Sequence, residues 1–164
     1  MSGFPPIVVR QPMSFDIVDD PVRACGVGTG FEGQFVARVR DGHGNQLAMV
    51  PVHAGGTGIW GNYDVALTVA TPSTAQGSLE VFEVSAADGS ELNKVAVPIT
   101  FGLALLNPYH GFAQYTVVDG DTLSSIAEKY YNDASRWPIV FEANRHQIHN
   151  PDHIFPGQVL RIPQ

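Results

Sequence analysis

Residues 114–164 read QYTVVDGDTLSSIAEKYYNDASRWPIVFEANRHQIHNPDHIFPGQVLRIPQ, and their pattern predicts the fold of the C-terminal third of the chain. It opens with an apolar run at 115–118, which predicts a strand. A Gly-Asp-Thr turn follows at 120–122, and a Pro-Gly turn at 156–157 precedes a second predicted strand at 159–162. Two helical patterns lie between these turns, so the predicted order is strand, helix, helix, strand.

Both helical patterns place apolar side chains on one face. The first repeats at i, i+3, i+4 and i+7, and Asp121 or Thr122 is a natural N-cap just before it. In the second, Ser135 can serve as the cap, and Pro138 then falls in the first turn, where its missing N–H does no harm. We expect the two stripes to cover one face of a two-stranded sheet; they consist of Leu123, Ile126, Ala127 and Tyr130, and of Trp137, Val140, Phe141 and Asn144.

This segment resembles the LysM (lysin motif) domain, and the resemblance covers roughly the last third of the chain. LysM domains bind glycans built on N-acetylglucosamine, chiefly peptidoglycan and chitin, in a shallow groove between the loop after the first strand and the loop before the last. The resemblance implies noncatalytic binding, with backbone groups on the acetamido group and apolar side chains against the sugar. The glycan-binding residues that it implies are Gly120, Asp121, Thr122, Leu123, Ile148, Asn150, Pro151, Asp152, Ile154, Phe155, Pro156 and Gly157.

The segment that follows Asn144 is longer than in the most compact LysM domains. It is similar to a subtype found in cell-wall proteins, in phage-derived proteins and in a cytoplasmic potassium-binding protein. Because the lengthened loop borders the groove, it bears on the sugar contacts more than on the fold. A second hypothesis therefore stays open, in which this is a structural or assembly protein whose LysM region docks a protein or senses an ion.

Residues 1–101 carry frequent turn signals, such as Asp-Gly-His-Gly-Asn at 41–45, and show no helical period. Phe35, Ala37 and Val39 alternate with Val36, Arg38 and Arg40, as on a half-buried antiparallel strand. Several short strands in such a segment are typical of an immunoglobulin-type β-sandwich. The predicted strands are 7–10, 22–27, 34–40, 46–52, 63–69, 78–84 and 92–100.

Three pieces of this half resemble the immunoglobulin-like domain of bacterial spore germination proteins. They are IVVRQP at 7–12, FEGQFVARVRDGHGNQL at 31–47 and LEVFEVSAADGSELNKVAVPITF at 79–101. The resemblance implies a fold and little chemistry. The predicted fold class is α+β with two domains, a sandwich at 1–101 and a small βααβ LysM domain at 114–164. The apolar linker at 102–113 is expected to pack against one or both of them.

Composition limits the partners. The chain has 9 Lys and Arg against 16 Asp and Glu, a net charge of -7, and no basic cluster. This balance argues against nucleic acid or an anionic membrane as a partner. Cys25 is the only cysteine, so no intramolecular disulfide can form. No apolar run is long enough to span a bilayer, and the N-terminus lacks a signal-peptide pattern. We expect a cytoplasmic protein, or one of the cell envelope if a leader has been removed.

Two further patterns are weighed and set aside. His146, His149 and His153 have the spacing of metal ligands on a helix, but Pro151 interrupts any helix there. We therefore expect solvated loop histidines and no metal. Residues 28–33 match Gly-x-Gly-x-x-Gly, but an alternating strand follows instead of the helix that a dinucleotide site requires.

The sequence predicts no catalytic arrangement and no cofactor. Cys25 and His53 have no activating surroundings, so a buried thiol is expected. Glu32, Asp64 and Glu80 could supply carboxylates for glycan hydrolysis, but they belong to a sandwich without an evident cleft. The predicted partners are peptidoglycan or N-acetylglucosamine oligomers, together with a protein partner through the sandwich. The residues expected to pack, in preference to stacking on sugar, are Trp60, Trp137 and Phe141.

Overall fold

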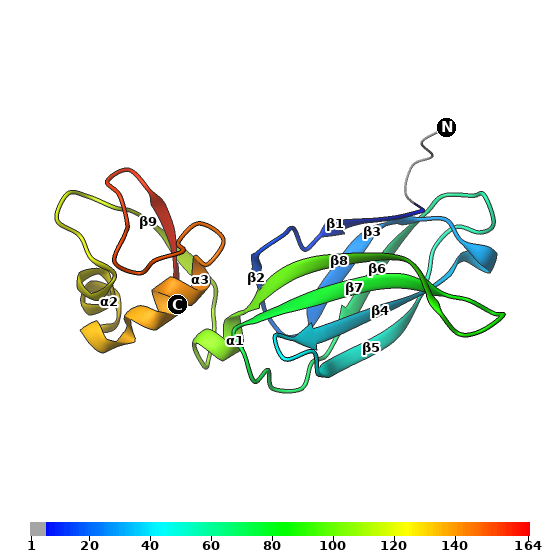
Figure 1. Cartoon of the computed structure of the whole chain (residues 1–164), viewed down its shortest axis with the longest axis horizontal. Helices are drawn as coiled ribbons and strands as arrows, with labels where there is room; N and C mark the ends of the chain where they lie inside the picture. Colours follow the sequence, from blue (N-terminus) through cyan, green and yellow to red (C-terminus); the bar gives the residue numbers. More distant parts are fainter. Residues whose placement is uncertain (1–5) are drawn as a thin grey trace. The chain divides into compact units, whose positions relative to one another are not determined.

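The computed structural model describes residues 6–164. The chain divides into two compact units between Phe101 and Gly102, and each unit is described by itself. The first unit is built from strands, and the second holds α-helices of four, nine and seven residues beside a small sheet (Figure 1). This arrangement confirms the α+β fold class that the sequence predicts.

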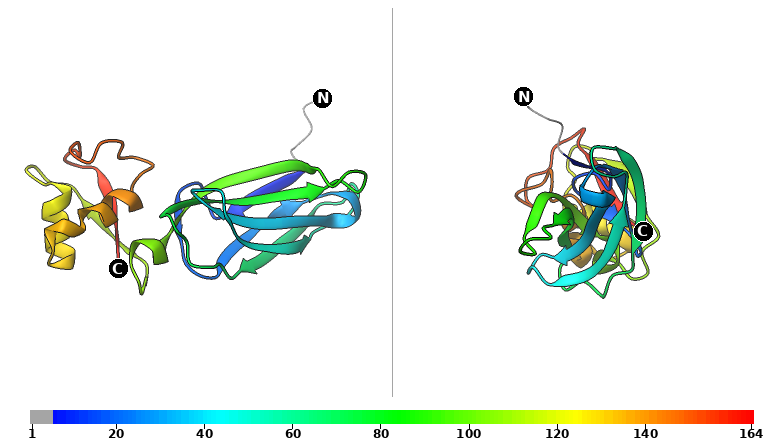
Figure 2. Two further views of the ribbon diagram at one scale, coloured as in Figure 1. Left: turned by 60° about the horizontal axis from the view of Figure 1, so that its bottom comes forward. Right: turned by 90° about the vertical axis from the view of Figure 1, so that its right-hand side faces the viewer.

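The first unit contains two sheets. One has the strand order β2-β8-β7-β4-β5 and the other the order β1-β3-β6. Neighbouring strands run antiparallel except β2 and β8, which run parallel. Figure 2 shows the sheets as two layers. The strands are β1 (Ile7–Gln11), β2 (Asp16–Val18), β3 (Val22–Gly28), β4 (Gln34–Asp41), β5 (Gln46–His53), β6 (Gly61–Leu67), β7 (Gln76–Val84) and β8 (Glu91–Phe101).

All seven predicted strands of this unit are present, with ends that differ by a few residues. The strand β2 is the addition. It has three residues and pairs with the end of β8 through Asp16 to Val18. A strand this short cannot show an alternating pattern, so the sequence gives no signal for it.

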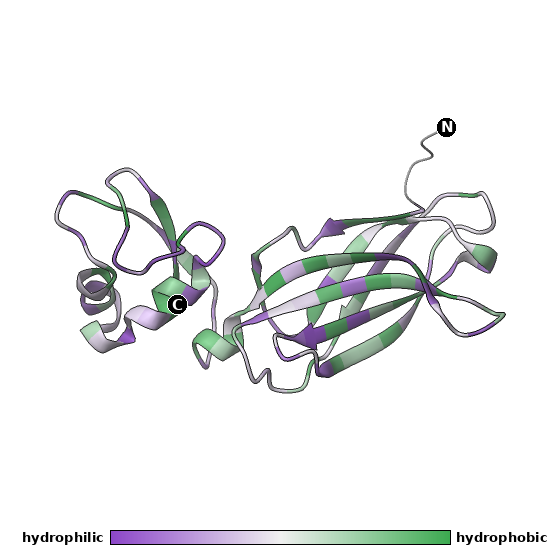
Figure 3. Cartoon of the chain, viewed as in Figure 1, coloured by the Kyte–Doolittle hydropathy of each residue, from purple (hydrophilic) through white to green (hydrophobic). Residues whose placement is uncertain are grey.

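The core of the sandwich lies between the two sheets. On β4, Phe35, Ala37 and Val39 are buried there, and they alternate with residues on the other face of the sheet. Figure 3 shows the resulting alternation of hydrophobic and hydrophilic residues along the strands. The core draws on both sheets and includes Ile7, Val22, Tyr63, Leu67, Leu79, Val81 and Ile99.

Arg38 departs from the expected pattern, because it faces away from the core and is nevertheless only 6% exposed. Its guanidinium donates to Glu80 Oε2 from Nε at 2.7 Å and to Glu91 Oε1 from Nη1 at 2.7 Å. It also lies 4.6 Å from the centre of the Phe82 ring. Two carboxylates and one aromatic ring therefore shield this charge on the outer face of the sheet.

The turn after β4 is organised by Asp41. Its carboxylate accepts hydrogen bonds from Ser73 Oγ at 2.6 Å and from the backbone N–H groups of His43 and Asn45. Asn45 Nδ2 donates to it as well, at 3.0 Å. The Ser73 and Asn45 side-chain hydrogen bonds lower the pKa of Asp41 to about 2. This carboxylate therefore ties the β4–β5 turn to the loop before β7.

The second unit begins with the short helix α1 (Gly102–Leu105), and its sheet pairs β9 (Phe112–Thr116) with β10 (Val159–Pro163). The strand β9 starts three residues before the predicted 115. Phe112 pairs with Pro163, and beyond it His110 N–H donates to Gln164 O, so the chain end extends the ladder. Residues 102–113, expected to be a linker, hold α1 and the start of this sheet.

The helix α2 (Leu123–Tyr131) begins at a capping box. Thr122 Oγ1 accepts from Ser125 N–H at 3.0 Å, and Ser125 Oγ accepts from Thr122 N–H at 2.9 Å. Of the two predicted caps, the structure therefore has Thr122 and not Asp121. Leu123, Ile126 and Ala127 are buried as the stripe predicts.

The helix α3 (Trp137–Ala143) follows a 3₁₀ turn, η2 (Ala134–Arg136), and Pro138 lies at its N-terminus as predicted. The prediction that Ser135 caps this helix is wrong. Asp133 caps the 3₁₀ turn instead, accepting from Ser135 N–H at 2.9 Å and Ser135 Oγ at 2.6 Å. The extra turn makes Arg136 the N-cap position of α3, and no side chain caps the helix there.

Candidate functional site

The loop after β9 is held by Asp121. Its Oδ2 accepts from Val118 N–H at 2.9 Å and from the Tyr115 hydroxyl at 2.7 Å. The Val118 and Tyr115 hydrogen bonds, with Lys129 nearby, lower the pKa of Asp121. Gly120 has a φ of 87°, which glycine adopts at little cost, and a Cβ there would meet no atom within 4 Å. The glycine is therefore needed for the turn and not for close packing.

The loop before β10 folds back on itself through local hydrogen bonds. Asn150 Oδ1 accepts from Asp152 N–H at 3.0 Å, and Gln158 Oε1 accepts from Phe155 N–H at 3.1 Å. Gly157 N–H donates to Val117 O at 2.8 Å, which fastens this loop to the segment after β9. The two loops that the resemblance assigns to the site are therefore joined side by side.

A groove of about 420 Å³ lies where these loops meet the start of α2. Six of the predicted glycan-binding residues line it, and they come from both loops. Two further residues, Ser124 and Trp137, line it without having been predicted as site residues. The full lining is Asp121, Thr122, Leu123, Ser124, Trp137, Pro151, Asp152 and Ile154.

The other predicted site residues do not line this groove. Gly120, Asn150, Phe155, Pro156 and Gly157 are exposed outside it, and the Phe155 side chain points into solvent. Ile148 is a correction, because it is 1% exposed and belongs to the core of the unit with Val117 and Leu160. Its N–H continues the turn after α3 by donating to Asn144 O, and this directs its side chain under the loop. A residue so buried cannot contact a sugar.

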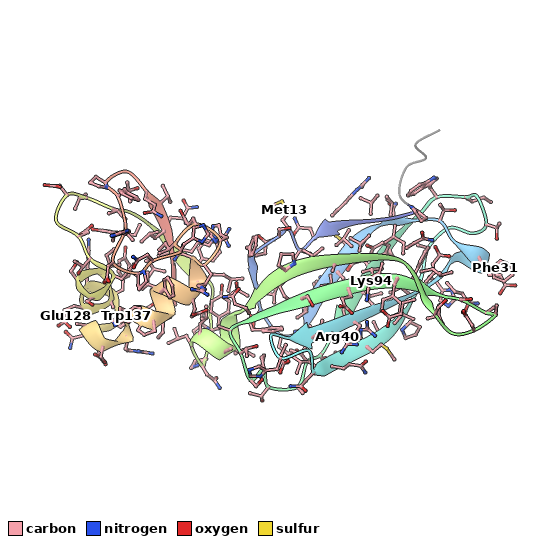
Figure 4. The ribbon with its side chains drawn as sticks, viewed as in Figure 1. Met13, Phe31, Arg40, Lys94, Glu128 and Trp137 are labelled. Atoms are coloured by element: carbon pink, nitrogen blue, oxygen red, sulfur yellow. The ribbon has the colours of Figure 1, made fainter. Side chains whose placement is uncertain are left out.

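Trp137 both packs against the core and lines the groove. Its ring packs against the core, with the Phe141 ring centre 6.1 Å away, and the same side chain lines the groove. Figure 4 labels Trp137 on α3, and Glu128 on α2. The stripe predicted only packing. Its place in the first turn of α3, directly after the 3₁₀ turn η2, is the signal that could have indicated exposure at a site.

The groove is acidic. Asp121 and Asp152 line it, and no Lys, Arg or His is among its lining residues. An indole face beside carboxylates and hydroxyls offers an apolar platform and hydrogen-bond acceptors together. These groups suit a neutral ligand that has hydroxyl and amide donors and a ring with an apolar face.

The remaining sequence patterns are resolved as packing or surface features. Residues 144–150 form turns, and within residues 6–164 no cluster of His, Cys, Asp and Glu is arranged to hold a metal ion. The Gly-x-Gly-x-x-Gly stretch leads into the strand β4, as predicted. Asp64 and Glu80 bond Arg23 and Arg38 on different sheets. Trp60 is 46% exposed in the β5–β6 loop, so it is not part of the sandwich core. The alternative that it makes a domain contact stays a prediction.

Comparisons with known proteins agree with both halves of this description. The model of the immunoglobulin-like domain of bacterial spore germination matches residues 6–90, and that of the LysM domain matches residues 115–163. Both are binding domains and not catalytic ones. The LysM match supports glycan binding as a general function of such domains. No helix in the described part of the chain is long and apolar enough to cross a membrane.

Three curated proteins share shorter stretches with the chain. It is 52% identical over 50 residues to the potassium binding protein Kbp of Escherichia coli, which is 30% of this chain and 34% of that protein. It is 51% identical over 53 residues to an uncharacterized protein of Deinococcus radiodurans, which is 32% of this chain and 20% of that protein. It is 44% identical over 64 residues to an esterase of Mycobacterium tuberculosis, covering 39% of this chain and 13% of the esterase. The chain thus spans about a third or less of these relatives.

Proposed function

Since this chain belongs to the family of the immunoglobulin-like domain of bacterial spore germination and carries a LysM domain, we propose that it binds N-acetylglucosamine-containing glycans. The ligand class is peptidoglycan or chitin-like polymer, and no bond of it is broken. The site is the groove between the loop after β9 and the loop before β10. Binding there would place the sandwich at a bacterial cell wall.

The observation that carries the proposal is the groove itself, which is lined by Trp137 together with Asp121 and Asp152. A volume of about 420 Å³ lies within the range of small-ligand sites, roughly 300–1,000 Å³. The indole can lie against the apolar face of a pyranose ring, and the carboxylates can accept hydrogen bonds from hydroxyl or acetamido N–H groups. These contacts need no metal and no reactive side chain.

LysM grooves are shallow as a family, and the chain has one LysM match. We therefore expect weak binding, with a Kd of roughly millimolar to micromolar order. A polymer that presents many repeats raises the apparent affinity only when several protein copies are linked. Retention on a polymeric wall then depends on the number of copies.

The test is a titration of the ¹⁵N-labelled full chain with a soluble N-acetylglucosamine tetramer, read from amide chemical shifts. We expect shifts at Asp121–Ser124 and at 152–154, together with the indole N–H of Trp137. The variant Trp137→Ala should lose this response, while Phe155→Ala, which changes an exposed ring outside the groove, should keep it. Shifts confined to the sandwich, or a response that needs Phe155 and not Trp137, would refute the assigned site.

The identity to a potassium binding protein favours a second candidate, in which the second unit binds a cation. The same labelled chain titrated with KCl, against NaCl at equal ionic strength, separates the two. Saturable shifts with K⁺ and none with the tetramer would replace the glycan proposal by this one.

A further inference from the structure

A second groove lies at one end of the sandwich. Its residues belong to the first unit, whereas the groove described above belongs to the second. It has a volume of about 440 Å³ and is formed by the turn η1 (Phe31–Gly33) and by the end of β7 with the start of β8. Figure 4 labels Phe31 at this end of the sandwich. We call it the end groove; its lining is Phe31, Glu32, Gln34, Glu83, Val84, Ser85, Ala86, Ala87 and Leu92.

The end groove presents large apolar side chains to water. Phe31 is 68% exposed, Val84 51% and Leu92 45%. Single exposed apolar residues are ordinary on a protein surface, but three that line one groove form a patch of the kind that binds a partner. Nothing among the described residues of the sandwich covers these side chains.

The backbone of the end groove is fixed before any partner arrives. Ala54 N–H donates to Gly33 O at 2.9 Å, and Glu32 N–H donates to Thr57 Oγ1 at 3.3 Å, so η1 is fastened to the β5–β6 loop. A Cβ at Gly30 would lie 2.9 Å from the Phe35 ring and 3.0 Å from Glu83 Oε2. Glycine at 30 therefore lets η1 lie close against the β7–β8 hairpin.

The charges of the end groove are all negative. Glu83 Oε1 accepts from Asn93 Nδ2 at 2.8 Å, and Glu32 Oε2 from Gln34 Nε2 at 3.4 Å. These partners are neutral amides, and within residues 6–164 neither carboxylate forms an ion pair. Among the residues that the structure describes, no Lys, Arg or His lines the groove. Two carboxylates beside an apolar surface attract a ligand that combines positive charge with apolar bulk.

We propose that the end groove binds an extended peptide segment of a partner protein, in which an apolar side chain stands beside a lysine or arginine. The apolar side chain lies among Phe31, Val84 and Leu92, and the basic group pairs with Glu32 or Glu83. A nucleic acid or an anionic lipid would be repelled by these carboxylates. The proposal is independent of glycan binding, because every residue of the end groove belongs to the sandwich.

The test uses two capped hexapeptides, one alternating leucine and lysine and one alternating leucine and glutamate. Each is titrated into the ¹⁵N-labelled full chain at low salt. We expect the leucine–lysine peptide to shift amides of 31–34 and 83–92. The leucine–glutamate peptide should bind at least about tenfold more weakly, since each exposed ion pair changes affinity by about two- to fivefold.

Two variants locate the effect. The double variant Glu32→Gln, Glu83→Gln keeps both hydrogen-bond acceptors and should weaken leucine–lysine binding by about tenfold. The matched control Glu128→Gln, at an exposed position of α2, should leave it unchanged. Phe31→Ala removes an exposed ring, so the fold is kept and binding falls. The proposal is overturned by equal binding of both peptides, by no effect of the double variant, or by the same shifts with the sugar tetramer.

Discussion

Asn144 should hold the second unit together, and its replacement gives the sharpest test of the fold. The side chain is 0% exposed. Its Nδ2 donates to Val140 O and to Arg161 O, both at 2.7 Å, and its Oδ1 accepts from Arg161 N–H at 2.8 Å. The amide thus closes the end of α3 and pairs with the edge of β10 as a neighbouring strand would. Gln147 Nε2 adds a further donor, at 3.1 Å.

Asn144→Ala removes the side-chain partner of three backbone groups, which are Val140 C=O, Arg161 C=O and Arg161 N–H. A buried backbone group that loses its hydrogen bond costs about 1–3 kcal/mol. Allowing for water at the partly buried edge of β10, we expect a loss of about 3–5 kcal/mol. A unit of about sixty residues has a total stability of roughly 3–9 kcal/mol. The variant should therefore lose at least about a third of the stability of this unit at 25 °C.

The assay is urea unfolding followed by Trp137 fluorescence, in a Trp60→Phe background that leaves one tryptophan. The control is Gln114→Ala, because Gln114 is exposed on β9 directly opposite Arg161. It should change stability by less than about 0.5 kcal/mol. If Asn144→Ala costs under 1 kcal/mol more than this control, the amide does not replace a strand and the reasoning is wrong.

Three other outcomes are expected. Ile126→Asp places a charge in the core of the second unit and should abolish its cooperative melting, checked by calorimetry, while Ser125→Asp at an exposed position of the same helix should keep it. Because hydrogen bonds lower the pKa of Asp41 to about 2, its contribution to stability is present above pH 4 and is lost as the pH falls from about 4 to 2. Asp41→Asn should therefore reduce the pH dependence of the free energy of sandwich unfolding in that window. An unchanged slope would count against the role assigned to this carboxylate. Trp137→Phe should keep the fold but weaken binding of the N-acetylglucosamine tetramer several-fold in the titration above, and unaltered binding would show that the indole is not part of the site.

The groove is predicted only in part, and the errors have two causes. Loop positions were assigned to the site from their place in the chain, but a loop buries some side chains and exposes others. Ile148 was expected at the sugar and belongs to the core, whereas Phe155 points into solvent. Trp137 was expected in the core and lines the groove as well. Helical spacing predicts the face of the helix on which a side chain lies. It does not predict whether neighbouring elements cover that side chain completely.

The order of strands and helices, both family resemblances and the two loops that bound the groove can be predicted from the sequence, because alternation, helical spacing and turn residues are local signals. Which loop residues meet depends on the tertiary structure. It brought Trp137 to the groove, buried Arg38 against Glu80 and Glu91, and joined η1 to the β5–β6 loop to make the end groove. These contacts link residues far apart in the chain, so their geometry depends on how whole elements pack and not on any short pattern.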